Sequence, residues 1–242
     1  MVPTTTVLLL GANSDVAKEC IKRYIKKGYF VIAASRSTVA LETFAAANNF
    51  PNTSLDIRYF DATAFQDHEA FYDALPAKPH IVVYAAGFQV TNDQALVDWD
   101  GSHRMIQVLY AGAVSILNRI VMDKDNSNLQ RIVGLSSLAG VRGRKSNFIY
   151  GSTKAAFTQY LAGLRQYLSS RHVTVNAIVA GYIDTKLTAH LDLPRNLLLQ
   201  PGYIADAVVN AGSRFIIVPG WKWKLIYRVL KSLPEGLVAK LP

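Results

Sequence analysis

Tyr150 and Lys154 are four residues apart, a spacing that places both side chains on one face of a helix. A free phenol has a pKa of about 10 and is a poor acid–base catalyst at neutral pH. A nearby ammonium group favours the phenolate, so Lys154 is expected to lower the pKa of Tyr150. Ser137 follows the apolar run 132–135 and is expected to hydrogen-bond a substrate oxygen and orient it toward Tyr150. The three residues predict a catalytic site that protonates a carbonyl oxygen.

A Tyr-x-x-x-Lys pair also occurs by chance on amphipathic helices, so the elements around it matter. The chain opens with an apolar strand at 6–10 that stops at Gly11, and apolar residues then recur at helical spacing. Such a turn brings a pyrophosphate close to Gly11 and to the amide groups of a helix start, which Asn13 and Ser14 can cap. Only one of the usual glycines is present. We expect nucleotide binding by Gly11, Asn13, Ser14, Asp15 and Val16.

The second apolar strand, at 29–37, ends without the acidic residue that binds the ribose hydroxyls of NAD. It offers Ser35 and Arg36, and a guanidinium group binds phosphate through a planar fork. This pattern favours NADP(H) over NAD(H), with a solvated loop cation as the alternative for Arg36.

Two further strands end in small or acidic residues, and ligands of open α/β sheets bind at the carboxyl ends of the strands. Asp61 is expected to meet the adenine, although a helix cap is an equally good interpretation. The alternation of strands and helices predicts one α/β domain with a doubly wound, Rossmann-like parallel sheet. The residues expected at these strand ends are Asp61, Ala62, Ala85, Ala86 and Gly87.

With these motifs the chain resembles the short-chain dehydrogenase/reductases over essentially its whole length. The resemblance implies an NAD(P)-dependent oxidoreductase acting on CH–OH or C=O groups, in which Tyr150 donates the proton and Lys154 binds the nicotinamide ribose. It also implies that Ser137 positions the carbonyl, and that Ile183 and Thr185 hold the carboxamide. A homodimer or homotetramer is expected.

Within the family, the chain is most similar to reductases that act on decaprenylphosphoryl 2-keto-ribose, through the stretches 6–11, 136–154 and 225–242. Two positions depart from the usual pattern of the family. Leu109 occupies the place of a usual asparagine that supports a proton relay, unless Gln107 is the true match. Ala180 stands where a proline is common.

Composition limits the remaining possibilities. The 242 residues are 50% hydrophobic and 18% charged, which suits one domain with an ample core. The single cysteine, Cys20, excludes a disulfide framework, and the five histidines show no metal-ligand spacing, so no metal site is expected. The N-terminal apolar run is too short for a signal peptide or a membrane span, which predicts a cytoplasmic protein.

A net charge of +9 raises the question of an anionic partner. Segment 221–242 holds five cations and one anion, and its apolar residues recur at helical spacing. A basic amphipathic helix is typical of contact with a membrane surface, and packing on the protein body or on a partner subunit is an equal alternative. No motif supports nucleic acid binding. The expected apolar stripe is Leu225, Ile226, Val229, Leu230 and Leu233, with Trp221 and Trp223 as interfacial aromatics.

The sequence therefore predicts a catalytic domain at 1–220, with a substrate loop at 184–200, and an amphipathic extension at 221–242. The favoured function is NADPH-dependent reduction of a ketone in a keto-sugar carried on a polyprenyl phosphate, at or near the inner membrane face. Two alternatives remain: a soluble ketone or ketoacyl reductase, and a non-catalytic cofactor-binding or scaffolding protein.

Overall fold

The computed structural model describes residues 5–189 and 192–240 and contains one parallel sheet of seven strands in the order β3-β2-β1-β4-β5-β6-β7. The order runs outward from β1 in both directions, which is the doubly wound arrangement that the sequence predicts. The second strand is shorter than expected, because its ladder to β3 stops at Ser35. The strands are β1 (Thr6–Leu10), β2 (Phe30–Ser35), β3 (Leu55–Tyr59), β4 (Ile81–Tyr84), β5 (Arg131–Ser137), β6 (Thr174–Ala180) and β7 (Ile216–Ile217).

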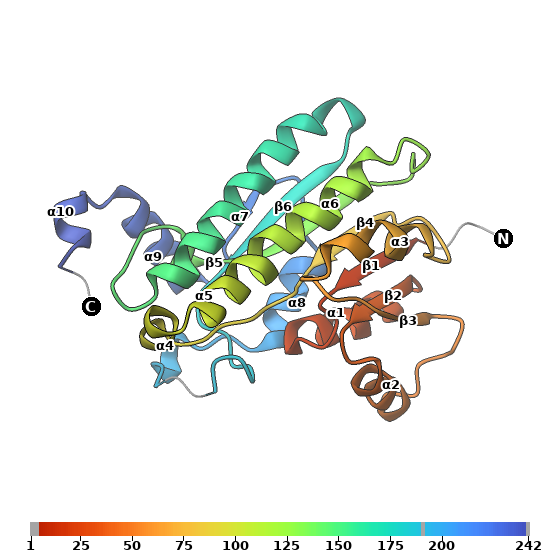
Figure 1. Ribbon diagram of the computed structural model, residues 1–242, viewed down its shortest axis with the longest axis horizontal. Coiled ribbons are helices and arrows are strands. Elements are labelled where there is room, and N and C mark those ends of the chain that lie inside the picture. The colour runs from red at the N-terminus through yellow and green to blue at the C-terminus, as the bar shows by residue number, and fades with distance from the viewer. Residues whose placement is uncertain (1–4, 190–191, 241–242) are drawn as a thin grey trace.

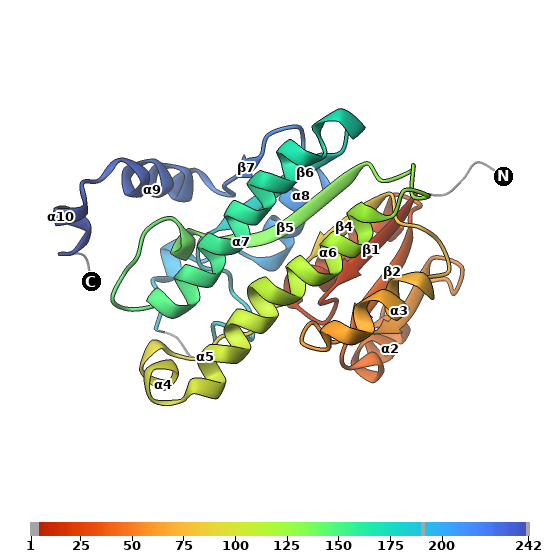
Figure 2. The same ribbon diagram turned by 45° about the horizontal axis from the view of Figure 1, so that its top comes forward.

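Helices cover both faces of the sheet (Figures 1 and 2). One face packs against α1, α2 and α8, and the other against α3, α5, α6 and α7. All five residues of β1 are buried, because their side chains point alternately into these two cores. The helices are α1 (Asp15–Lys26), α2 (Thr38–Ala47), α3 (His68–Asp73), α4 (Asn92–Val97), α5 (Trp99–Ile106), α6 (Gly112–Met122), α7 (Phe148–Tyr167), α8 (Pro201–Val209), α9 (Trp221–Ser232) and α10 (Glu235–Val238).

Helices α5 and α6 form one continuous stretch, joined by a π-helical turn at Gln107–Ala111. The stretch Trp99–Met122 is long and apolar enough to cross a membrane by length and composition, with a mean hydropathy of 1.5. Half of its most apolar window is buried inside the fold. It is therefore a core helix of this domain.

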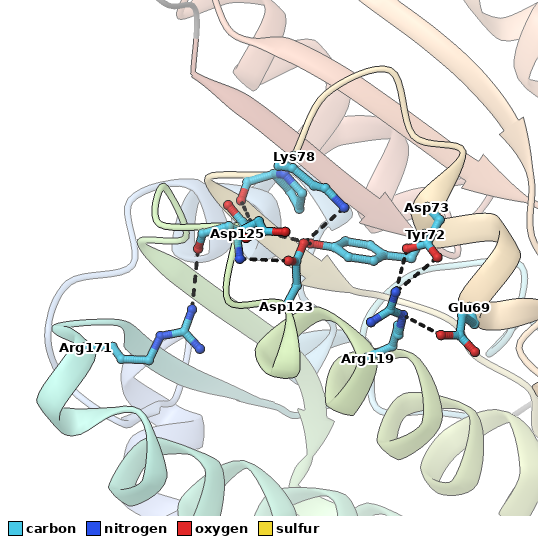
Figure 3. Close-up of polar contacts among 10 residues, drawn as sticks. Glu69, Tyr72, Asp73, Lys78, Arg119, Asp123, Asp125 and Arg171 are labelled. Carbon is cyan, nitrogen blue, oxygen red and sulfur yellow. Dashed lines mark hydrogen bonds and ion pairs between the residues drawn. The ribbon is translucent and has the colours of Figure 1, made fainter.

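A polar cluster joins α3 to the end of α6 (Figure 3). The Tyr72 hydroxyl donates to the Asp123 carboxylate at 2.8 Å, and Lys78 approaches the same carboxylate at 3.0 Å. Arg119 bridges Asp73 at 2.7 Å, so the two helices are held by charge as well as by packing. None of these residues lines the cleft described below, which indicates a structural role.

The apolar residues of α9 divide between two faces. Leu230 is buried, and Ile226 and Leu233 pack on the core, whereas Leu225 and Val229 are exposed. The single apolar stripe expected from the sequence is therefore wrong for these two residues. The two tryptophans differ in the same way, since Trp223 is buried and Trp221 is 72% exposed.

Candidate active site

A cleft of about 460 Å³ lies at the carboxyl ends of the central strands. Every residue expected to bind a cofactor lines it, and Ser137 is placed immediately beyond two lining residues, Leu135 and Ser136. The sequence analysis missed several lining residues that carry no polar motif. The full lining is Gly11, Asn13, Ser14, Asp15, Val16, Ser35, Arg36, Phe60, Asp61, Ala62, Ala85, Ala86, Gly87, Val108, Leu109, Leu135, Ser136, Tyr150, Lys154, Ile183, Thr185, Lys186 and Leu187.

Gly11 forms the turn between β1 and α1 with a φ of +83°, which favours glycine. A Cβ atom there would lie 2.3 Å from the Ala86 backbone nitrogen, so only glycine lets the β1 and β4 strand ends approach this closely. Ser14 caps α1 by accepting a hydrogen bond from the Ala17 amide at 3.1 Å. Asp15 and Val16, the first residues of α1, line the cleft, and the start of a helix favours anionic oxygens.

Asn13 does not cap the helix as expected. Its side-chain amide donates to the Ser35 hydroxyl at 2.9 Å and to the Ser37 carbonyl at 2.7 Å. Asn13 therefore ties the first turn to the end of β2 and orients Ser35. The buried Oδ1 of Asn13 has no hydrogen-bond partner among the described residues, so this acceptor is available to a hydroxyl or amide of a bound nucleotide.

Two strand ends provide the features expected to select the nucleotide. Arg36 is exposed and lines the cleft beside Ser35, where a 2′-phosphate could reach its guanidinium group. Asp61 lines the cleft too, and its carboxylate accepts from the amide and the hydroxyl of Thr63, both at 2.9 Å. Asp61 therefore shapes a turn and borders the site, but it does not cap a helix, since Ala64 precedes the next helical turn. Its contact with the adenine stays a prediction.

Tyr150 and Lys154 lie on one face of α7, as their spacing predicts. The Lys154 ammonium lies 5.9 Å from the centre of the Tyr150 ring and donates to the Leu135 carbonyl at 2.7 Å. Lys154 is only 5% exposed. Glycines at 140 and 151 allow this packing, because a Cβ at Gly151 would lie 2.6 Å from the Ala139 carbonyl oxygen.

The two pKa values do not follow the expectation. Burial raises the pKa of Tyr150 to about 12, opposed by a hydrogen bond with Ser137. Burial also lowers the pKa of Lys154 to about 8. The phenol loses hydration that would stabilise its anion, and the ammonium is directed to a carbonyl oxygen rather than to the phenol oxygen. In the protein alone, Tyr150 is therefore a protonated hydrogen-bond donor.

The π-helical turn decides which residue replaces the usual asparagine. Leu109 and Val108 line the cleft, whereas Gln107 does not. The Tyr84 hydroxyl donates to the Val108 carbonyl at 2.6 Å and stabilises the turn from β4. The cleft wall near Lys154 is therefore apolar at this position, and Gln107 does not substitute.

The loop after β6 closes one side of the cleft through contacts with distant segments. The Lys186 amide donates to the Asp15 carboxylate at 2.9 Å, which links the loop to the start of α1. At its base, the Asp184 amide donates to the Leu199 carbonyl at 2.9 Å. Residues 190 and 191 of the expected substrate loop lie outside the described residues. Asp15 thus holds the loop in addition to lining the cleft.

Trp223 of α9 packs on the start of this loop. Its indole donates to the Leu197 carbonyl at 2.9 Å, and a Cβ at Gly181 would lie 2.1 Å from the ring. At the C-terminal end of α9, the Arg142 guanidinium donates to the Leu230 and Lys231 carbonyls at 3.1 and 3.0 Å. The loop that follows Ser137 is therefore joined to the C-terminal segment. No periodic pattern in the sequence indicates these two contacts.

Among the residues that the structure describes, no three His, Cys, Asp or Glu side chains gather as metal ligands. Cys20 is buried in α1, and burial raises the pKa of its thiol to about 12. It is a core residue remote from the cleft lining.

The chain is similar to known oxidoreductases over its length. A protein of Mycobacterium tuberculosis described as an uncharacterized oxidoreductase is 25% identical over 98% of this chain and 96% of its own. One from Streptomyces coelicolor with the same description is 29% identical over 99% of this chain and 96% of its own. Neither description gives a substrate.

Solved structures with the same fold include a short chain dehydrogenase from Burkholderia cenocepacia in complex with NADP, with a TM-score of 0.82, 19% identity, and coverage of 97% of this chain and 95% of that one. A short-chain dehydrogenase from Sphingobium yanoikuyae in complex with NADPH has a TM-score of 0.81, 20% identity, and coverage of 98% and 96%. The family model for short chain dehydrogenases matches residues 5–196. The chain belongs to the short-chain dehydrogenase family of NAD(P)-dependent oxidoreductases.

Proposed function

We propose that the protein is an NADPH-dependent carbonyl reductase in which Ser137, Tyr150 and Lys154 are the catalytic residues. The observation that carries this proposal is the single cleft at which Tyr150 and Lys154 meet the phosphate turn at Gly11 and the strand end at Arg36. Residues 1–220 then form the catalytic domain, and 221–242 an extension of it. A non-catalytic role explains less, because a scaffold has no need for a buried lysine beside a partly buried tyrosine in the same cleft.

Bound NADPH would supply the hydride that reduces the carbonyl carbon. Tyr150, whose raised pKa keeps it protonated, donates a proton to the carbonyl oxygen. Ser137 hydrogen-bonds the same oxygen and orients it toward Tyr150. Lys154 binds the nicotinamide ribose, and Leu109 keeps this wall of the cleft apolar. With no asparagine there, a replacement proton reaches Tyr150 through water or the ribose.

The preference for NADPH is proposed from Ser35 and Arg36, where the 2′-phosphate would form charge-assisted hydrogen bonds. NADP or NADPH in the related Burkholderia and Sphingobium structures supports it. The test is a fluorescence titration of both cofactors. NADPH is expected to bind roughly ten- to a hundredfold more tightly than NADH, and Arg36→Ala to remove most of that difference. Equal affinities in the unmodified protein would exclude this role for Arg36.

The substrate that we propose is a keto-sugar carried on a polyprenyl phosphate, with segment 221–242 contacting the inner face of the membrane. The likeness of stretches 6–11, 136–154 and 225–242 to decaprenylphosphoryl 2-keto-ribose reductases supports this class, as does the basic charge of the last stretch. A soluble ketone or ketoacyl substrate is the second candidate. It is supported by the burial of Trp223, which shows that α9 also has a packing role.

NADPH oxidation, followed by absorbance, distinguishes the candidates. A lipid-linked keto-sugar in detergent is expected to be reduced with a far higher kcat/KM than a matched short-chain ketone or a ketoacyl thioester. The reverse order of substrates would replace the first candidate with the second. No oxidation with any carbonyl compound, despite NADPH binding, would favour the non-catalytic role.

A further inference from the structure

Helix α9 presents a second apolar face that no part of the described chain covers. Trp221 is 72% exposed, Leu225 55% and Val229 49%. These three residues are spaced four apart, so they form one stripe along the outside of the helix. The opposite face holds the buried Trp223 and Leu230. The helix is therefore apolar on two sides, and packing accounts for only one of them.

Cations flank the exposed stripe. Lys224, Arg228 and Lys231 are exposed, and none forms an ion pair within residues 5–189 and 192–240. Glu235 is the one acidic residue from position 221 to position 242. The outward face thus combines apolar side chains with unpaired positive charge, the pattern of a helix that lies in a membrane interface.

A groove between α8 and α9 extends this charge. It has a volume of about 500 Å³, and its lining includes Arg214 together with Lys224 and Arg228. The one acidic residue of the lining, Asp206, is already bridged by Arg23 at 2.6 Å. Tyr203, 52% exposed, also lines the groove. The groove offers three cations and two phenols, those of Tyr203 and Tyr227, to an anionic headgroup.

The position of α9 suits this contact. Both views place α9 and α10 at the end of the molecule away from β1 and β2 (Figures 1 and 2). The Trp223 indole donates a hydrogen bond to the Leu197 carbonyl, and the Lys222 ammonium donates one to the Asn196 carbonyl. Both carbonyls belong to the loop that closes the cleft. A membrane surface in contact with α9 would therefore lie next to the substrate loop.

A second copy of the chain is a poorer occupant of this face. A twofold interface pairs the same patch with itself, so the three free cations would face their own copies. Anionic phospholipid supplies the opposite charge together with an apolar phase for Trp221, Leu225 and Val229.

We propose that the outward face of α9, made of Trp221, Leu225 and Val229 with Lys224, Arg228 and Lys231, is a docking surface for an anionic phospholipid membrane. This inference deepens the proposed action on a lipid-linked substrate, but it rests on the exposed residues of α9. It is tested without cofactor or substrate, so the docking surface and the reductase activity can fail independently.

The experiment is flotation of the full-length protein with vesicles of phosphatidylcholine alone or mixed with phosphatidylglycerol. The protein is expected to float only with the mixed vesicles. Replacement of Lys224, Arg228 and Lys231 by Gln should weaken binding roughly a hundredfold, since each cation near the surface contributes about a fivefold factor. Raising the salt to ~1 M should release the unmodified protein, because the Debye length falls to about 3 Å.

Matched variants control for charge and for exposed apolar area. Gln at Lys26, Lys124 and Lys145 removes equal charge from exposed positions outside α9 and should leave at least half of the flotation. Trp221→Ala and Leu225→Ser should each reduce flotation several-fold. Their controls, Trp99→Ala and Leu96→Ser, remove side chains that are 67% and 60% exposed and should change little.

Three outcomes would overturn the proposal. The first is equal flotation with both kinds of vesicle, and the second is an equal loss in the control variants. The third is a protein that ignores anionic vesicles but dissociates from a dimer to a monomer, in sedimentation, on Trp221→Ala. That last result would assign the face to contact between copies. Unchanged thermal unfolding of the variants establishes that they are folded.

Discussion

The nucleotide-binding half of the molecule, β1 to β4, and the half that follows it are built by different kinds of contact. In the first half the side-chain bonds that shape the cleft span few residues, from Asp61 to Thr63 up to the 24 positions between Asn13 and Ser37. In the second half they join distant segments, such as Arg142 to Leu230 and Lys186 to Asp15. The nucleotide half is therefore shaped by turns and neighbouring strand ends, whereas the substrate side is assembled from loops and a C-terminal helix.

Tyr150→Phe gives the largest effect and separates the two halves most clearly. The variant loses the proposed proton donor but none of the residues that line the phosphate turn. Turnover on an identified ketone is expected to fall by ~10²- to 10⁴-fold, the scale of a positioned general acid. NADPH affinity, measured by fluorescence, should change by less than about twofold, which corresponds to about 0.4 kcal/mol of binding free energy. A variant that remained active would show that another group donates the proton.

Gly11→Ala is expected to disrupt the nucleotide-binding half. The new Cβ would meet backbone atoms of Ala85 and Ala86 at 2.7 and 2.3 Å, and backbone cannot move aside as a side chain can. The positive φ adds about 1–2 kcal/mol of strain. NADPH binding is expected to weaken by ~100-fold or more, equivalent to about 2.7 kcal/mol. Calorimetric titration measures this, with Gly143→Ala as the control, because a Cβ there meets nothing within 4 Å. Unchanged affinity would refute the close approach at Gly11.

Gly181→Ala perturbs the second half, and here the added Cβ overlaps a side chain instead of backbone atoms. The Cβ would overlap the Trp223 ring, so the indole must leave its site and its bond to Leu197. Displacing a buried tryptophan is expected to cost about 3 kcal/mol of stability, measured by urea unfolding. NADPH affinity should fall far less than in Gly11→Ala. If both glycine variants lost NADPH equally, the division into two halves would be wrong.

Lys154→Met is expected to have the smallest effect on folding stability among these variants, and the sign of that effect depends on pH. The pKa of Lys154 falls from 10.5 to about 8 on folding, which corresponds to about 3 kcal/mol of destabilisation below pH 8. Replacing Lys154 removes this destabilisation, but the lost hydrogen bond to the Leu135 carbonyl cancels about 1 kcal/mol of the gain. The variant is therefore expected to be about 2 kcal/mol more stable than the unmodified protein at pH 7.

The unfolded chain binds more protons than the folded one between pH 8 and 10.5, so the unmodified protein gains stability as pH rises through this window. The advantage of Lys154→Met should therefore shrink toward pH 10.5. Urea unfolding at several pH values measures it, and Lys145→Met, at an exposed position, is the control. A pH-independent difference would mean that folding does not lower the pKa of Lys154.

The sequence predicts the turn at Gly11 and the end of the first strand, because the apolar run 6–10 stops there and helical spacing follows, whereas it places the end of β2 two residues too late. It does not predict the raised pKa of Tyr150, since burial depends on the packing of α7 against the cleft. Nor does helical spacing predict that α9 divides its apolar residues between core and solvent. That division depends on Gly181 and Arg142, which lie far from α9 in sequence.

The Arg142 contacts also bear on the order in which the molecule is made. The guanidinium meets carbonyls 88 and 89 positions later in the chain, so these bonds cannot form until α9 has left the ribosome. Strands β1 to β4 need no such partner, because their pairings with one another all lie within residues 6–84. During synthesis the nascent protein therefore holds its nucleotide pocket before the loop after Ser137 has found its support.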